Sequence, residues 1–366
     1  MKNKLITTAL VSSILGLGVT SAVAQTTITG NLELSYYSLS HEGNATATQK
    51  TLNTRGFGKE SQINIANKGK LTNGMDYAAG FSLEMDGPDG STNFNAGQTA
   101  GSWNENVYID LISGNTTITV GADHIQNPDR NVTNLVGFGY LGIDGVNNLI
   151  SSYSKSIGSP YSNFGVGVVQ NIGVGRVSAL YTPGGAAVND ILNGVQSNQV
   201  DAAESAYELG FRGDLGVKGL DVGIFYNKSD KAGQIAANKD LKGQKIDFSY
   251  NMGQFTVAGE LAKQAGVDTQ TGTVSGYDAG PDTHKMKSIG VAYAIDKALS
   301  IGYTYGVADS DSAVANQTAD EKINLFAIGY NLGPVTAQLQ YKQVDNASNF
   351  NGLDAEQISA RLATKF

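Results

Sequence analysis

The sequence contains no cysteine, which excludes disulfides, thiolate catalysis and cysteine-ligated metal sites. Only three histidines occur, His41, His124 and His284, and each lies in a segment that we predict to be a loop. Asp123 and His124 are adjacent, but neighbouring side chains of an extended chain point apart, which argues against an acid–base pair. We therefore predict that the protein is not an enzyme and that it has no catalytic residue, cofactor or metal site.

Other features are also scarce. Proline occurs 6 times and tryptophan once, against 46 glycines, 17 tyrosines and 12 phenylalanines. Beyond the N-terminus, no apolar run approaches the ~20 residues that a transmembrane helix needs. The formal net charge of −8 argues against nucleic acid as a partner. Abundant glycine and tyrosine with modest hydrophobicity favour a large antiparallel β protein over a helical one.

The N-terminus is typical of a secretory signal peptide. A short basic stretch (1–4) precedes a mostly apolar run (5–19), and the small residues at 21–24 match an A-x-A-like cleavage site. A single membrane anchor is the alternative, but the apolar run is too short and is interrupted by threonine, serine and glycine. We predict cleavage after Ala24, with residues 1–24 as signal peptide and residues 25–366 as one β-barrel domain.

From Thr26 onward, apolar and polar residues alternate with a period of two, which is typical of β-strands with two unlike faces. We count sixteen such strands, and the last, within 353–366, ends the chain on Phe366. A last strand that pairs with the first leaves no free edge, so we predict a closed antiparallel barrel. One strand is ambiguous: either 149–157 or 165–170 is the sixth, and the segment around 176–181 belongs to the seventh.

The predicted connections alternate in length. Short turns at one end and longer loops at the other, joined by strands of about ten residues, are typical of a transmembrane barrel. We place the short turns at 67–73, 113–115, 213–219, 252–254, 296–298 and 331–334, and the long loops at 41–59, 87–101, 123–148, 183–202, 229–242, 266–284, 309–320 and 345–352.

A soluble β-sandwich or barrel is the alternative architecture, and in it the apolar faces of the strands would form an interior. A barrel of sixteen strands is too wide for side chains to fill. The polar faces must then line water, and the apolar faces must look outward into lipid, with aromatic side chains near the strand ends at the interfaces.

With these features, the chain resembles the general porins of Gram-negative bacteria. The resemblance spans residues 25–366 and is carried by the stretches TTITGNLELSYYS, SQINIANKGKLTNGMDYAAGFSLEMD and NVYIDLISGNTTITVGAD and by the terminal Phe366. It implies a water-filled, sixteen-stranded barrel in the outer membrane, usually trimeric, with short periplasmic turns, longer extracellular loops and the third long loop folded into the lumen. It also implies that the barrel-assembly machinery reads Phe366 and that lipopolysaccharide and other outer-membrane lipid surround the barrel. Family members often carry an arginine directly after the Thr-x-x-Gly strand, whereas this chain reads Gly121-Ala122-Asp123-His124.

Strand parity assigns charged side chains to the channel wall. An excess of acids over bases predicts a lumen that mildly favours cations, although each charge could instead be solvated or paired with a cross-strand neighbour. The inward acids are Glu33, Glu84, Asp110, Asp123, Glu208, Asp221, Asp247 and Glu260, and the inward bases are Arg176, Arg212, Lys245, Lys342 and Arg361.

The candidate third loop, 123–148, carries further charges: Asp123, His124, Asp129, Arg130 and Asp144. Folded inward, it would set Asp129 and Asp144 against a basic stretch of wall and create a transverse field across a constriction. The alternative is an ordinary surface loop.

We therefore predict a channel for passive diffusion of small hydrophilic solutes and ions, with no cofactor. Two alternatives stay open. One is a channel whose inward residues bind a particular solute, and the other is a plugged barrel with a structural or adhesive role. The moderate loop lengths and the lack of a recognisable plug domain in the sequence favour the open channel.

Overall fold

The computed structural model describes residues 24–42, 53–84, 105–121, 132–138, 165–182, 205–229, 241–265, 283–309, 318–347 and 351–366. Within these ranges, no helix is long and apolar enough to cross a bilayer. The strands are β1 (Gln25–Glu42), β2 (Asn53–Lys70), β3 (Asp76–Glu84), β4 (Glu105–Ser113), β5 (Thr116–Gly121), β6 (Gly165–Asn171), β7 (Arg176–Thr182), β8 (Ala206–Gly213), β9 (Leu220–Ser229), β10 (Leu241–Met252), β11 (Phe255–Ala265), β12 (Thr283–Ala294), β13 (Leu299–Asp309), β14 (Glu321–Asn331), β15 (Val335–Asp345) and β16 (Asp354–Lys365).

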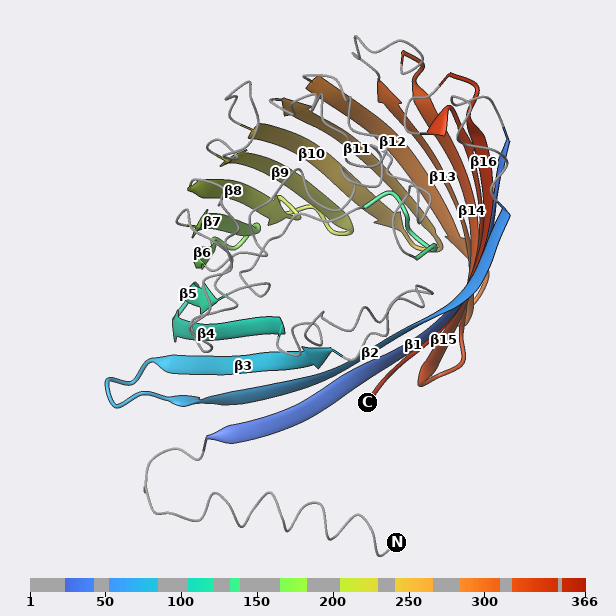
Figure 1. The fold of residues 1–366 in the computed structure, drawn as a ribbon. Helices are drawn as coiled ribbons and strands as arrows, with labels where there is room; N and C mark the ends of the chain where they lie inside the picture. The colour runs from blue at the N-terminus through green and yellow to red at the C-terminus, as the bar shows by residue number, and fades with distance from the viewer. Residues whose placement is uncertain are drawn as a thin grey trace, which may run out of the picture.

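These sixteen strands form one closed barrel. Each strand pairs antiparallel with its neighbours in sequence, and β1 also pairs with β16, where Leu34 lies opposite Leu362. Figure 1 shows the strands curving around a common interior. Because the first and last strands pair, the sheet has no free edge. The predicted fold, a closed antiparallel barrel of sixteen strands, is confirmed.

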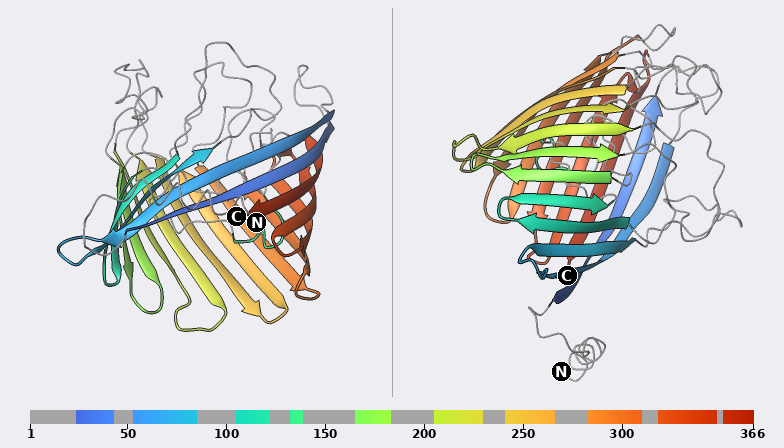
Figure 2. Two further views of the ribbon diagram at one scale, coloured as in Figure 1. Left: turned by 90° about the horizontal axis from the view of Figure 1, so that it is seen from below. Right: turned by 90° about the vertical axis from the view of Figure 1, so that its left-hand side faces the viewer.

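The two ends of the barrel differ in the length of their connections. Turns of two to six residues join β2–β3, β4–β5, β6–β7, β8–β9, β10–β11, β12–β13 and β14–β15 at one end, where both Gln25 and Phe366 also lie (Figure 2). The connections at the other end are eight residues or longer. Gly114 and Gly253 open two-residue hairpins with φ of 56° and 77°, the left-handed backbone that such turns require.

Two of the predicted connections, one long loop and one short turn, have the wrong bounds. We predicted a loop over 41–59, but β1 continues to Glu42 and β2 already begins at Asn53, and the first short turn is 71–75 rather than 67–73. Glycines conceal the alternation in this stretch, because Gly56 and Gly58 have no side chains. Side chains of β1 occupy the space beside these two glycines. An added Cβ would lie 2.9 Å from Tyr37 Oη at Gly56 and 2.6 Å from Ser35 Oγ at Gly58.

The ambiguous sixth strand is resolved in favour of the second alternative. It runs over Gly165–Asn171 as β6, and the seventh strand, β7, covers Arg176–Thr182 as expected. The other candidate for the sixth strand, 149–157, lies outside the described residues.

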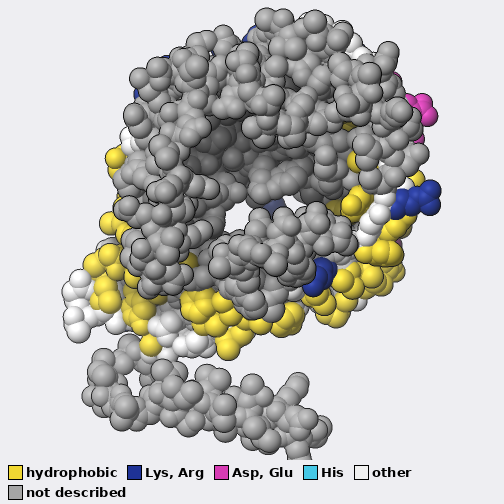
Figure 3. Space-filling model, in the orientation of Figure 1, with side chains coloured by type: hydrophobic (Ala, Val, Ile, Leu, Met, Phe, Trp, Pro, Cys, Tyr) yellow, Lys and Arg dark blue, Asp and Glu magenta, His cyan; other side chains and the backbone are white. Residues whose placement is uncertain are grey.

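The outer face of the barrel is apolar. Ile109 and Leu261, for example, are 55% and 58% exposed, and Figure 3 shows hydrophobic side chains along the outer surface. Aromatic pairs cross neighbouring strands near both ends: Tyr207 and Tyr226 have ring centroids 6.0 Å apart, and Phe255 and Tyr293 4.6 Å apart. An apolar band between two aromatic girdles is the outer surface that a membrane barrel presents to lipid.

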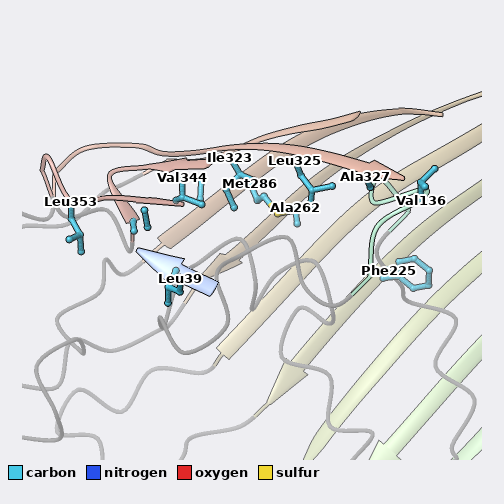
Figure 4. Close-up of a cluster of buried hydrophobic side chains, with 13 residues drawn as sticks. Leu39, Val136, Phe225, Ala262, Met286, Ile323, Leu325, Ala327, Val344 and Leu353 are labelled. Carbon is cyan, nitrogen blue, oxygen red and sulfur yellow. The ribbon is translucent and has the colours of Figure 1, made fainter. Parts of the chain in front are cut away.

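The inner face is not polar throughout, so the expectation of polar inward faces is wrong for part of β14. On β14, Ile323 and Leu325 point inward and are 0% and 1% exposed. They belong to a hydrophobic cluster that also contains Met286 and Val136, and Figure 4 shows these side chains together. Apolar side chains are stable on this part of the inner wall because protein atoms, rather than water, cover them.

Candidate functional site on the inner wall of the barrel

The strand register decides which side chains share the inner face, because paired residues lie on the same side of a sheet. One inner row runs from Arg212 through Gly223, Asp247 and Glu260 to Ser288, across β8 to β12. Eleven of the charged residues assigned to the channel wall lie on this face: Glu33, Asp110, Arg176, Glu208, Arg212, Asp221, Lys245, Asp247, Glu260, Lys342 and Arg361. Of Glu84 only the backbone is described, and it pairs with Gln62.

A buried network of charges crosses β8 to β11. Arg212 donates from Nη1 to Asp221 Oδ2 at 2.8 Å and from Nη2 to Asp247 Oδ2 at 2.9 Å. Lys245 Nζ lies 3.0 Å from Glu260 Oε2 and 3.9 Å from Asp247 Oδ2. Among these five side chains, three carboxylates share two bases.

Contacts between opposite charges offset the cost of burying these charged side chains. The side chains of Lys245, Asp247 and Glu260 are fully buried, and Arg212 is 5% exposed. Asp247 and Glu260 lie directly opposite each other in the register, an arrangement that repels unless a cation intervenes. Lys245 supplies that cation. Removing one partner of such a cluster leaves an uncompensated buried charge, which is strongly destabilising.

Phe225 is an inward-facing aromatic residue that sequence reasoning missed. It is 2% exposed, and the Arg212 guanidinium carbon lies 5.2 Å from its ring centroid, within the range of a cation–π contact. The ring lies against Gly210 and Gly223, where an added Cβ would come within 2.9 and 2.6 Å of ring carbons. The alternation of β9 already placed Phe225 on the face of Asp221, and that parity was the available signal.

A second charged pair lies near the barrel seam. Arg361 Nη2 on β16 is 2.5 Å from Glu33 Oε2 on β1. The Arg361 guanidinium carbon also lies 5.6 Å from the ring centroid of Phe138. Elsewhere on the inner wall, Thr119 Oγ1 on β5 donates a 2.6 Å hydrogen bond to Asp110 Oδ1 on β4. The inner wall therefore carries fixed charges on several strands rather than on one.

Residues 132–138 lie inside the barrel against the inner wall. Thr133 Oγ1 is 2.9 Å from Ser288 Oγ on β12, and Thr304 Oγ1 on β13 donates to the Thr133 carbonyl oxygen at 2.7 Å. On β15, Gln338 Nε2 donates to the carbonyl oxygen of Val136 at 2.8 Å. This segment belongs to the third long connection, between β5 and β6, so the predicted inward fold is confirmed for these residues.

Three wall glycines make room for the segment. An added Cβ at Gly290 would collide with the Thr133 carbonyl oxygen, and one at Gly302 would lie 2.8 Å from Val136 Cγ2. At Gly329 an added Cβ would lie 3.2 Å from Val136 Cγ1 and 3.1 Å from Ser300 Oγ. Glycine on β12, β13 and β14 therefore allows the segment to lie directly on the wall.

The remaining loop charges fall outside the described residues: Asp123, His124, Asp129, Arg130 and Asp144. The transverse field that we expect between these charges and the wall stays a prediction.

The chain ends on the outer face at the short-turn end. The main chains of Phe366 and Gly30 exchange two hydrogen bonds, of 2.8 and 3.0 Å. The Phe366 ring is 71% exposed and lies over Gly30, where an added Cβ would be 2.5 Å from Cζ. The terminal aromatic side chain is thus accessible, while its backbone completes the pairing of β16 with β1.

Comparisons with known proteins agree with this architecture. A family model described as Gram-negative porin matches residues 7–360, and no curated protein sequence matches the chain significantly. The anion-selective porin from Comamonas acidovorans is similar with a TM-score of 0.61 at 13% identity, over 94% of this chain and 100% of that one. Salmonella typhi OmpF, in a complex with daunomycin, has a TM-score of 0.63 at 11% identity, over 93% and 97%. OmpT of Vibrio cholerae has a TM-score of 0.53 at 12% identity, over 94% and 100%. At these identities the solved structures share the fold.

Proposed function

The chain belongs to the Gram-negative porin family and forms an outer-membrane channel, and we propose that this channel passes small hydrophilic solutes and ions by passive diffusion, with a mild preference for cations. The observation that carries the proposal is the charged inner wall of a closed sixteen-stranded barrel. A barrel of this size is wide enough to hold water, and permeation then follows size and charge rather than chemistry.

Two features support discrimination by size and by charge. The segment 132–138 occupies part of the interior against β12 to β15, so it reduces the cross-section open to solutes. In the network of Arg212, Asp221, Lys245, Asp247 and Glu260, carboxylates outnumber bases by three to two, and this acidic composition supports a preference for cations near β8 to β11. Among the charges of the inner wall, we propose that this network contributes most to the ion selectivity of the channel.

The decisive experiment is single-channel recording of the purified protein in a planar bilayer under a KCl gradient. Conductance with a mildly cation-selective reversal potential is the expected result. An anion-selective potential would keep the channel and reject the assigned cation preference. Conductance that saturates with one solute would favour a solute-specific channel. A folded, heat-modifiable barrel without conductance would favour a structural or adhesive role.

We further propose that three copies assemble into a homotrimer in contact with lipopolysaccharide, and that residues 1–24 are removed as a signal peptide. The start of β1 at Gln25, directly after the expected cleavage site, supports the second point. Conductance steps in groups of three would support the trimer. Single, independent steps at every protein concentration would contradict it.

Finally, we propose that the barrel-assembly machinery recognises Phe366, whose exposed ring supports this role. Phe366→Ala retains the backbone bonds to Gly30, so refolding in detergent should be nearly normal while the amount in the outer membrane of cells falls. Equal amounts of wild type and variant in cells would contradict the role.

A further inference from the structure

The inner wall of the barrel is not equally open to water. Many inward-facing polar side chains of β5 to β15 are at most 9% exposed: Thr119, Ser178, Glu208, Asn227, Ser288, Thr304 and Gln340. On β1 and β2, by contrast, the inward-facing residues in the middle of the strands are partly exposed or exposed. We call this stretch the open arc; it consists of Glu33, Ser35 and Tyr37 of β1, Gly56, Gly58 and Glu60 of β2, and Arg361 of β16.

Glu60 is an inward-facing acid of the open arc that sequence reasoning missed. It lies directly opposite Glu33 in the β1–β2 register, so both residues face the lumen. Glu33 is held by the ion pair with Arg361. Among the described acids that face inward from the strands, Glu60 alone is both exposed and without a partner in the described part of the chain. A positively charged solute can therefore reach this carboxylate without separating an ion pair between described residues.

Aromatic rings lie close to this carboxylate on the same side of the lumen. Tyr37 faces inward and is partly exposed, and its ring lies over Gly56, where an added Cβ would be 3.0 Å from both Cε1 and Cζ. The partly exposed Phe138, at the end of the segment inside the barrel, lies against Arg361 of the open arc, 5.6 Å from the guanidinium carbon to the ring centroid. Aromatic rings attract organic cations as well as apolar groups.

The register places the Tyr37 ring and Glu60 at a distance that one small solute can span. Tyr37 pairs with Gly56, and Gly56 and Glu60 are four residues apart, which corresponds to about 13 Å between Cα atoms along β2. Ser35 and Gly58, paired with each other, lie between them and carry the smallest side chains of the open arc apart from Gly56. The wall between the ring and the carboxylate is therefore low enough to admit a solute.

We propose that the open arc binds small solutes in which an organic ammonium group is joined to an apolar body, with the ammonium on Glu60 and the apolar body against the Tyr37 ring. This inference rests on the proposed function and deepens it, because it names a class of solute for the same channel. The buried network on β8 to β11 acts on ions through its field, whereas Glu60 acts by direct contact. An exposed ion pair is weak, so the solute is held briefly and then passes through.

The first test measures whether a solute occupies the open arc. Because the chain contains no cysteine, one introduced cysteine is a unique reporter. Ser35→Cys places it in the open arc, and Ser178→Cys places it on the inner wall of β7, where Ser178 is 5% exposed. In full-length, refolded protein, a cationic methanethiosulfonate reagent should modify Ser35→Cys much faster than Ser178→Cys. The solute 2-phenylethylammonium should slow the modification of Ser35→Cys, and Glu60→Gln in the same chain should remove this protection. Mass spectrometry measures both effects without requiring conduction.

The second test measures block of single-channel current in KCl by 2-phenylethylammonium, by the neutral 2-phenylethanol and by ethylammonium, which lacks the ring. In wild type the first should block at lower concentration than the other two. Glu60→Gln should weaken this block roughly two- to fivefold, the effect of losing an exposed ion pair. Tyr37→Leu should weaken it by a similar factor, roughly two- to fivefold, through loss of the aromatic face. Glu356→Gln removes an exposed acid from the outer face of β16 and is the control, with unchanged block.

Three results would overturn the inference: equal block of wild type and Glu60→Gln, equal weakening in Glu356→Gln and Glu60→Gln, or protection of Ser35→Cys that survives Glu60→Gln. A channel that conducts but shows neither block nor protection would reject the inference and leave the proposed function intact. A folded barrel that does not conduct but shows protection dependent on Glu60 would count against the proposed function alone.

Discussion

Thr304 Oγ1 donates a 2.7 Å hydrogen bond to the main-chain carbonyl oxygen of Thr133, which joins the wall strand β13 to the segment inside the barrel. The same carbonyl oxygen also accepts from Leu135 N–H, at 3.1 Å. Together with the Thr133–Ser288 contact, this bond holds residues 132–138 at a fixed place on the wall. The width of the channel therefore depends on side chains of the wall as well as on the loop.

Thr304→Val should loosen this attachment while preserving the shape of the side chain. The lost hydrogen bond is worth about 1 kcal/mol, so the segment should leave its position more often and the open-channel current should become noisier. Thr304→Ser retains the hydroxyl and should behave like wild type. Identical current noise in Thr304→Val and wild type would show that this bond does not hold the segment.

Gly290→Val should push the segment away from the wall. Its Cβ would occupy the position of the Thr133 carbonyl oxygen, and a backbone atom cannot move aside as a flexible side chain can. With the wall behind it, the segment can move only toward the lumen, so the single-channel conductance should fall. Ile289→Val changes an outward-facing, 51% exposed neighbour and is the control, with unchanged conductance. A normal conductance in Gly290→Val would mean that the segment does not limit permeation.

Lys245 and Glu260 form a pair suited to a double-mutant cycle. Lys245→Gln breaks a fully buried pair, so it should cost about 3–5 kcal/mol in unfolding free energy and, by leaving more negative charge, should raise cation preference. Glu260→Gln should shift the reversal potential the other way. The double variant restores the original net charge and should recover both the reversal potential and part of the lost stability. Urea unfolding and reversal potentials provide the two measurements, and additive effects would show that the two residues are not coupled.

The turn between β12 and β13 gives a pH-dependent contribution to stability. Main-chain N–H groups of Leu299 and Ala298 donate to Asp296 Oδ1 at 2.8 and 2.7 Å, and these bonds lower the pKa of Asp296 below its ordinary value of 3.8. Because the folded pKa is the lower one, the stabilisation is complete above the ordinary pKa and is lost as the pH falls through the folded pKa.

Asp296→Asn should therefore be less stable than wild type at neutral pH, with the difference vanishing in acid. Unfolding free energies measured between pH 2 and 7 (roughly the range over which a carboxyl group titrates) would follow this change. Lys297→Gln alters the charge of the same turn without touching these bonds, and its difference from wild type should not disappear in this way. A pH-independent gap between Asp296→Asn and wild type would reject the assignment.

Much of the fold could be predicted from the sequence because strand alternation is a local property. Ile28 to Tyr36 and the final strand to Phe366 show a period of two without reference to any other part of the chain. The failures occurred where that signal is absent. Gly56 and Gly58 hide the beginning of β2, and in β14 both faces are apolar, with Leu325 inward beside the outward-facing Phe326.

The sequence by itself determined the closed barrel, its two unlike ends and the face on which each charge lies, since parity depends only on position within a strand. It did not determine which charges meet. Lys245 contacts Glu260 on the next strand because the β10–β11 register brings Asp247 and Glu260 side by side, and register is a relation between strands. The contact of Thr133 with Ser288 and Thr304 joins residues more than 150 positions apart, so only the tertiary structure decided where this segment lies.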